Sequence, residues 1–486
     1  MKKIKNIFKL LIAQSLTVIV ILLFISLVGQ IYAFLNPSYE NIDVIPDRQL
    51  GWKLVPNSMF TYTGVHWYKN EFKTQIKINS LGFRDKERTI KKQKDLTRLV
   101  VIGDSSVAAF EVPFEKTPTQ LLEKYLNEAN TKQALQGKEY EVLNFGVGGF
   151  GLGQNLITNK TYVKQFSPEY VFLFIFEGDI WRTISPISAV TNKLPQEKKL
   201  HIRPVINVDE NQLQSLLKIL NFREFHEYLA NLKMEKLKLK QLDSISEKEY
   251  LNFMEQQRSL ITKNKIIKIS KVLAEMKLSV LYPSNDFDKF VNMQKHTINT
   301  KFNGQRTRKR EQKLFILELW SKLVSALNNL SRIFQPDIKM KDELELLLKI
   351  YGPTKPKDLG GQGLFSGSFD FPNFEKTVFT NLKVIQTMRD DVKSFGGNLV
   401  IVDATRHLIQ KGRLPANLLS TILEKYCNVN GIGYVPLYQD LNKANLSGQK
   451  TRWPYDGHLN ELGYRIFAES MYRWLQDNET DRSLNN

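Results

Sequence analysis

The first residue that could do chemistry is Ser105, which stands in the sequence Gly103-Asp104-Ser105 after a short apolar run. A serine on the tight turn after a buried strand is held rigidly at the edge of a sheet, where its hydroxyl can attack an ester carbonyl. Such a site also needs a base, a carboxylate that orients the base, and N–H donors for the oxyanion. Gly-Asp-Ser alone is a weak signal, because about one chain in ten of this length contains it by chance.

The best candidate for the base is His458, in the sequence Trp453-Pro-Tyr-Asp-Gly-His-Leu-Asn-Glu-Leu-Gly463. Asp456 precedes it by two residues, so one loop can bring the carboxylate to the imidazole Nδ1 and leave Nε2 facing Ser105. We therefore predict that Ser105, His458 and Asp456 form a catalytic triad, with Ser105 Oγ about 2.6–3.5 Å from His458 Nε2. The other histidines lack such a local frame and are expected to be ordinary surface or core residues.

The elements that must position these residues are short, continuously apolar runs that alternate with helical segments. This alternation predicts a parallel sheet covered by helices on both faces. In such sheets, ligands bind beyond the carboxyl ends of the strands. Three polar or glycine-rich segments follow predicted strands in this way, at 103–106, 146–149 and 177–179, so we expect them to meet at one rim. The strands are predicted near 98–102, 140–144, 170–176, 397–402 and 432–437.

The order and spacing of these segments resemble the SGNH (GDSL-type) hydrolase superfamily. Gly103-Asp-Ser-Ser106, Asn144-Phe-Gly-Val-Gly-Gly149 and Asp456-Gly-His-Leu-Asn460 are similar to its blocks I, II and V. The resemblance covers about residues 96–200 and 371–478. It implies that Ser105 is the nucleophile and first oxyanion donor, that Gly149 is the second donor, and that His458 and Asp456 are the base and its orienting acid. No cofactor or metal ion is expected.

One block departs from the family pattern. The third block of the family supplies an Asn side chain to the oxyanion hole, usually as Asn-Asp. Here the sequence is Phe176-Glu-Gly-Asp-Ile180, so Gly178 stands where that Asn is expected, or the Asn is deleted, and Asp179 matches the Asp. Losing one oxyanion donor typically costs ~10²–10³ in turnover. Gly178 is nevertheless expected beside Ser105 and Gly149, with its backbone N–H as one candidate for a replacement donor.

The N-terminal segment predicts a membrane anchor. Residues 10–35 carry no charged side chain, and a stretch of about 26 residues can cross a ~30 Å hydrocarbon core. Lys2, Lys3, Lys5 and Lys9 precede it, which by the positive-inside rule places the N-terminus in the cytoplasm and the rest of the chain outside. A signal peptide cleaved after Ala33 is the alternative, but Ile31 is a poor match to the small residue that cleavage requires.

These observations predict five parts of the chain. They are a cytoplasmic stub and transmembrane anchor (1–36), an extension of short strands and turns (37–95), the first part of the hydrolase domain (96–200), a Lys-rich helical insertion (201–370) and the second part of that domain (371–480). The expected fold class is α/β, a three-layer α/β/α sandwich with a five-stranded parallel flavodoxin-like sheet. The insertion is either a solvated helical addition or a lid or docking surface for an acidic partner.

The formal net charge of +19 raises the question of nucleic acid, but no recognition motif accompanies it, so we predict no nucleic-acid partner. An anionic lipid or envelope polymer fits the charge better. The single cysteine, Cys427, excludes an intrachain disulfide and is expected in the core.

Three functions stay open. They are an extracytoplasmic esterase acting on acylated carbohydrate or lipid of the envelope, an O-acyltransferase using the same triad, and a binding module without turnover.

Overall fold

The computed structural model of the 486-residue chain describes most of the sheet domain and parts of the segments around it. The described residues are 2–37, 39–41, 44–66, 69–131, 139–184, 187–190, 199–220, 259, 261–282, 307–309, 317, 320, 371–405 and 417–484.

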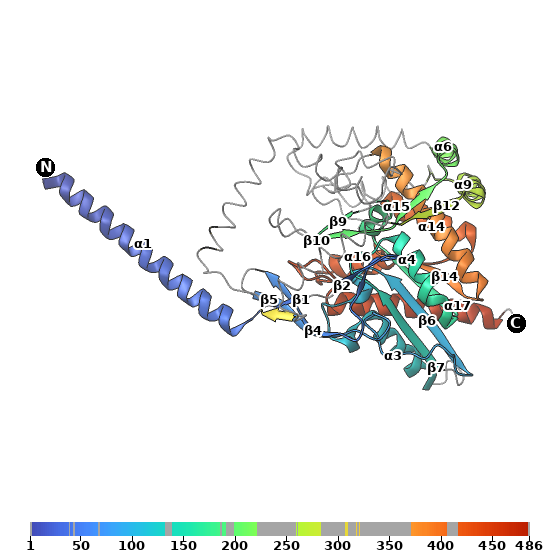
Figure 1. Ribbon diagram of the computed structural model, residues 1–486, viewed down its shortest axis with the longest axis horizontal. Helices are drawn as coiled ribbons and strands as arrows, with labels where there is room; N and C mark the ends of the chain where they lie inside the picture. The colour runs from blue at the N-terminus through green and yellow to red at the C-terminus, as the bar shows by residue number, and fades with distance from the viewer. Residues whose placement is uncertain are drawn as a thin grey trace.

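The N-terminal helix α1 (Lys2–Leu35) extends away from the rest of the molecule (Figure 1). Its segment Ile12–Tyr32 is long and apolar enough to cross a membrane, and almost none of it is buried against the protein. Side chains such as Phe24 and Phe34 are exposed, which is unfavourable in water and expected in lipid. Length and composition fit both an anchor and a signal sequence.

The centre of the molecule is the predicted five-stranded parallel sheet, which confirms the expected fold class. The strand order is β15-β14-β8-β6-β7, the flavodoxin-like order in which the first strand lies between the second and the third. Every residue of β8 is buried, as a continuously apolar run requires when helices cover both faces. The strands are β6 (Leu96–Gly103), β7 (Glu139–Gly146), β8 (Tyr170–Ile175), β14 (Asn398–Asp403) and β15 (Gly433–Val435).

Helices form a layer on each face of the sheet (Figure 1). Successive side chains of β6 point to opposite faces of the sheet. Val100 packs into the hydrophobic cluster on one face, and Val101 packs into the cluster on the other. The layer on the Val101 side consists of α3 (Pro118–Thr131), α16 (Leu437–Leu446) and α17 (Glu461–Leu484). The layer on the Val100 side includes α4 (Leu152–Thr158), α6 (Glu210–Ile219), α9 (Lys263–Glu275), α14 (Phe371–Ser394) and α15 (Asn417–Asn430).

The N-terminal extension packs onto this domain through two hairpins. Trp52 and Ile76 are almost fully buried and belong to the hydrophobic cluster on the Val100 side of the sheet. The first hairpin pairs β2 (Val44–Asp47) with β3 (Gly51–Leu54), and the second pairs β4 (Met59–His66) with β5 (Lys69–Lys77). The extension is therefore part of the packed molecule, not a flexible linker.

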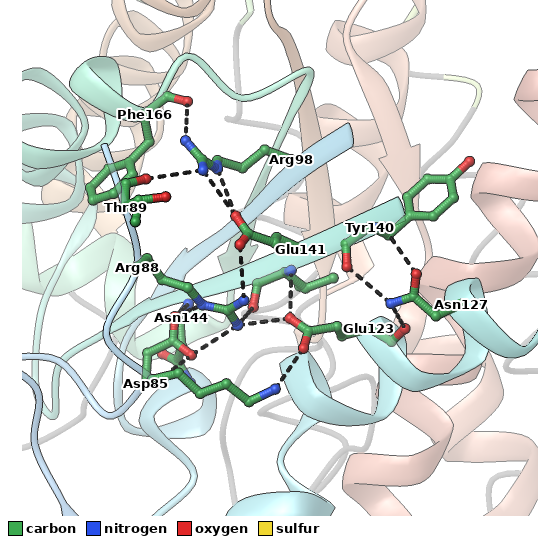
Figure 2. A network of polar contacts seen from close by, with 12 residues as sticks. Asp85, Arg88, Thr89, Arg98, Glu123, Asn127, Tyr140, Glu141, Asn144 and Phe166 are labelled. Atoms are coloured by element: carbon green, nitrogen blue, oxygen red, sulfur yellow. Dashed lines mark hydrogen bonds and ion pairs between the residues drawn. The ribbon is translucent and has the colours of Figure 1, made fainter. Parts of the chain in front are cut away.

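Polar and charged side chains cover β7, one of the two edge strands of the sheet (Figure 2). Asn127 bonds both backbone groups of Tyr140, Glu123 accepts from Val142 N, and Asp85 accepts from Asn144 N. Arg88 pairs with Asp85 and Glu123 and donates to Val142 O. These bonds satisfy the outward backbone groups that would otherwise be available to another strand. The edge is closed by the protein's own side chains.

The described residues between 187 and 309 contain strands as well as helices. β11 (Val205–Val208) pairs with β12 (Leu278–Leu281), beside α6 and α9. β9 (Ile187–Val190) pairs with β10 (Lys199–Ile202), and β13 (Thr307–Lys309) pairs with β1 (Tyr39–Asn41). Much of the predicted helical insertion (201–370) lies outside the described residues. The remaining short elements are η1 (Phe114–Lys116), η2 (Asn159–Val163) and η3 (Lys164–Phe166).

Candidate active site

Ser105 opens the four-residue helix α2 (Ser105–Ala108) directly after β6. The Asp104 side chain caps this helix by accepting from Ser106 N at 2.9 Å. Asn144, at the end of the neighbouring strand β7, donates to Val107 O at 2.8 Å and accepts from Gly146 N at 2.9 Å. A Cβ on Gly146 would collide with the backbone of α2. The close approach of β7 and α2 thus fixes the serine at the rim of the sheet.

The structure brings the three predicted residues into contact. Ser105 Oγ lies 2.8 Å from His458 Nε2, within the predicted range, although 353 residues separate them in sequence. His458 Nδ1 lies 2.5 Å from Asp456 Oδ1. A carboxylate oxygen can only accept, so Nδ1 carries a proton and Nε2 faces the serine. The arrangement is that of a nucleophile, a base and an orienting acid.

The loop that carries His458 and Asp456 is held from two sides. Within the loop, Trp453 N donates to His458 O at 2.9 Å, and Gly457 takes the left-handed conformation that the turn needs, with φ +88°. From β5, the Glu71 carboxylate accepts from Tyr455 N at 3.1 Å and from Asp456 N at 2.7 Å. The sequence indicated no chemistry in the N-terminal extension, and Glu71 was missed because only the fold places it against this loop.

The glycine-rich loop after β7 lies against the serine. A Cβ on Gly148 would be 3.9 Å from the Cβ of Ser105. Trp52 Nε1 donates to Gly148 O at 3.0 Å, and the buried Arg203 donates to Gly149 O at 3.1 Å. In a trans peptide the N–H points opposite to the preceding C=O, so the Gly149 N–H points away from Trp52. This geometry is compatible with the predicted oxyanion role of Gly149, which stays a prediction.

The third predicted donor, Gly178, lies in the first turn of α5 (Glu177–Arg182). A Cβ at this position would collide with the Phe176 ring, so an asparagine here would have to displace that ring. The role of Gly178 as a donor stays a prediction. Asp179 is fully buried and accepts from Phe176 N at 3.0 Å, which caps the helix, and from Arg182 at 2.8 Å.

Arg182 links α5 to the turn that carries Asp104 and Ser105 (the nucleophile turn), and no local motif in the sequence marks Arg182 as part of the site. Its Nη1 lies 2.9 Å from Asp104 Oδ2, the same oxygen that is 3.4 Å from Ser105 Oγ. It also bonds Asp179 and Phe150 O. Burial opposes the charged form, but Asp179 and Asp104 raise the pKa of Arg182 above its ordinary value. A permanent positive charge therefore lies close to the nucleophile, on the carboxylate of the preceding residue.

A second carboxylate lies beside the imidazole. Glu111 is 2 % exposed, and its Oε1 is 3.5 Å from His458 Nδ1. Burial lowers the basicity of His458, but the charges of Glu111, Asp456 and Asp104 outweigh it and raise the pKa of His458 to about 9. Burial alone would raise the pKa of Asp456. The hydrogen bond to His458 outweighs this effect and holds the pKa of Asp456 below its usual value. A carboxylate within the apolar run around Val107–Val112 is the sequence signal that could have indicated Glu111.

These three side chains also have the composition of a metal site, with ligand atoms within 4.8 Å of one another. Two ligands of one tetrahedral ion at ~2.1 Å would lie about 3.4 Å apart. The 2.5 Å contact between His458 and Asp456 is too short for that and fits a charge-assisted hydrogen bond. The cluster fits a proton-handling site better than a cation site.

No family model matches the chain, and no curated protein matches it. Among the solved structures that are similar to this chain are the following three. A lipolytic G-D-S-L family protein from Veillonella parvula is 10% identical, with a TM-score of 0.30, over 78% of this chain and 97% of that one. The acetyl xylan esterase AlAXEase is 11% identical, with a TM-score of 0.30, over 77% and 98%. LAE5, an α/β hydrolase from the metagenome of Lake Arreo, is 10% identical, with a TM-score of 0.29, over 78% and 94%. At these TM-scores the likeness carries no argument about what this chain does.

Proposed function

We propose that this chain is a membrane-anchored serine esterase of the SGNH type, which acts outside the cytoplasm on acyl esters of an envelope carbohydrate or lipid. The observation that carries the proposal is the line of contacts from Ser105 Oγ through His458 to Asp456 at 2.8 and 2.5 Å. The blocks around Ser105, Gly149 and His458 support the SGNH type, and α1 supports the anchor.

The residues provide each step of acyl transfer to water. Neutral His458 accepts the Ser105 proton at Nε2 while Oγ attacks the ester carbonyl. The backbone N–H groups of Ser105 and Gly149 would stabilise the oxyanion. His458 then donates the proton to the departing alcohol oxygen, which leaves an acyl ester on Ser105. Water attacks this ester and gives its proton to His458. His458 then returns that proton to Ser105 Oγ as the acyl–oxygen bond breaks, which releases the acid and restores the neutral serine and imidazole.

The test is labelling of the full-length chain with a fluorophosphonate, together with p-nitrophenyl acetate hydrolysis. Wild type should react and Ser105→Ala should not. Ser106→Ala is the matched control, because it removes the neighbouring hydroxyl and keeps the backbone N–H that binds Asp104. If wild type and Ser105→Ala behave alike in both assays and on acylated sugars, the esterase proposal is wrong and the binding module is favoured.

The transferase differs from the esterase only after the acyl-enzyme forms. A carbohydrate hydroxyl would then replace water as the acceptor. Adding an unacylated sugar acceptor to the p-nitrophenyl acetate assay distinguishes the two. Acetate as the main product supports the esterase, whereas acetylated sugar at the expense of acetate would assign the transferase.

A further inference from the structure

The starting observation is the buried carboxylate of Glu111, which the triad mechanism does not use. It lies in the loop between α2 and η1, close in sequence to the fully buried aliphatic side chains of Val107, Ala109 and Val112. Placing a carboxylate in such surroundings is costly unless a positive charge or several donors compensate. Its neutral partner is Tyr464 of α17, whose hydroxyl donates to Oε2 at 2.8 Å.

The loop is fixed so that this carboxylate points at the imidazole. The guanidinium of Arg84, which is 1 % exposed, donates to the carbonyl oxygens of Ala108, Ala109 and Val112, on either side of Glu111. Glu111 Oε1 is then 3.5 Å from His458 Nδ1, on the same ring nitrogen that Asp456 contacts. Two carboxylates thus lie near the same ring nitrogen, Asp456 at hydrogen-bond distance and Glu111 at ion-pair distance.

We propose that Glu111 is a positioning residue of the active site, a second carboxylate that acts with Asp456 to orient His458 and stabilise its positive charge. The inference rests on the proposed esterase function of the same site. In an ordinary triad, a single carboxylate orients the base and stabilises the imidazolium that forms after proton transfer. Two carboxylates on one nitrogen stabilise the imidazolium more strongly, which favours the transition state but also keeps more of the resting base protonated.

The consequence is an alkaline pH dependence. The titratable and charged groups around His458 include Glu111 with Tyr464 from α17, Asp456 from its own loop and Asp104 from the nucleophile turn. Arg84 lies beyond Glu111, Glu71 of β5 accepts from Asp456 N, and Arg182 of α5 pairs with Asp104. Burial raises the pKa of Glu111, and the imidazolium opposes that rise. With a His458 pKa of about 9, reactivity of Ser105 should increase with pH through a midpoint near 9.

The experiment measures the rate of fluorophosphonate labelling of the full-length chain between pH 6 and 10. Glu111→Gln should move the midpoint down by about 1–3 pH units, because it removes one negative charge near Nδ1. Glu111→Asp shortens the side chain by one methylene and moves the carboxylate away from Nδ1. It should shift the midpoint in the same direction by a smaller amount, so the test remains possible if the Gln variant folds poorly. A purely structural Glu111 would lower the rate at every pH and leave the midpoint at the wild-type value, which would overturn the proposal.

Asp403→Asn is the matched control. Asp403 is also fully buried, lies at the end of β14, and accepts from a tyrosine hydroxyl, Tyr434, at 2.7 Å. Its loss should leave the midpoint unchanged, and an equal shift would show that the effect is not specific to Glu111.

A second measurement separates this inference from the proposed function. In a Ser105→Ala background, an NMR titration of ¹³C-labelled histidine, with His458 assigned by His458→Asn, gives the pKa of the imidazole without any reaction. A failure of wild type to label overturns the esterase proposal. If the pKa of His458 measured by NMR is the same with and without the Glu111→Gln substitution, the role of Glu111 is overturned.

Discussion

Glu71 acts on the triad from outside the sheet domain. Its carboxylate accepts two backbone N–H groups of the loop that carries Asp456 and His458. A carboxylate that accepts from adjacent N–H groups fixes the course of a loop, and small displacements of a base reduce catalysis strongly. The position of His458 therefore depends on a strand of the N-terminal extension.

We predict that Glu71→Gln lowers kcat of p-nitrophenyl acetate hydrolysis roughly tenfold and changes KM little, because about one charge-assisted bond is weakened. Glu87→Gln is the control. Glu87 also accepts a backbone N–H, from Ser80 at 2.8 Å, and lies in the same extension. Equal losses in the two variants would mean that the extension matters only for folding.

The raised pKa of His458 predicts a pH-dependent stability. The folded pKa of about 9 lies above the ordinary 6.5, so the stabilisation from the carboxylates is complete below 6.5 and is lost as pH rises through 9. The melting temperature of wild type should therefore exceed that of His458→Asn most at pH 6, and the difference should shrink by pH 10. A difference that is constant or grows with pH would contradict the charge pairing.

At the scale of elements, α2 and α5 are joined by Arg182. Its partners Asp104 and Asp179 are 2 % and 0 % exposed. Two buried carboxylates that face one guanidinium are stable only while the cation is present. Because Asp104 caps α2, the position of Ser105 depends on a residue of α5.

We predict that Arg182→Gln lowers the free energy of unfolding by about 3–5 kcal/mol, the usual cost of removing one partner from a buried ion pair. Arg473→Gln is the comparison, because Arg473 pairs with Asp440 at 2.5 Å but is 57% exposed. That variant should lose no more than about 1 kcal/mol. Urea unfolding measures both, and similar losses would show that burial does not govern the Arg182 pair.

The elements of the sheet and the contact between His458 and Asp456 could be predicted from sequence because their signals are local. Continuous apolar runs indicate buried parallel strands, and Asp456 and His458 lie two residues apart. Glu111, Glu71 and Arg182 could not be assigned, because their roles depend on contacts between segments that are distant in sequence. A single sequence does not specify such tertiary pairs.

At the scale of the whole molecule, the N-terminal extension connects α1 with the active site. Asn70 donates to Pro37 O at 3.2 Å, two residues after the end of α1, and the next residue, Glu71, binds the triad loop. Tyr39 N donates to Thr63 of β4 at 3.2 Å. The segment that follows α1 is thus bonded to the hairpin that also supports His458.

The charges that flank the apolar segment of α1 predict its orientation in a membrane. Four lysines precede the apolar segment, and positive residues are retained in the cytoplasm, so the C-terminus should lie outside. Alkaline phosphatase fused after Asn486 should be active, and a reporter that needs the cytoplasm should be inactive there. Replacing Lys2, Lys3, Lys5 and Lys9 with Glu is the control and should weaken this orientation.

An N-terminal tag distinguishes an anchor from a signal sequence in the same cells. An uncleaved anchor keeps the tag on the full-length, membrane-bound chain, whereas cleavage after Ala33 would give a shorter chain without it. We expect the tag to be retained, because Ile31 does not fit the small residue required for cleavage. Strong activity of the cytoplasmic reporter at Asn486 would reverse the topology, and it would place the Ser105 site in the cytoplasm, away from any envelope ester.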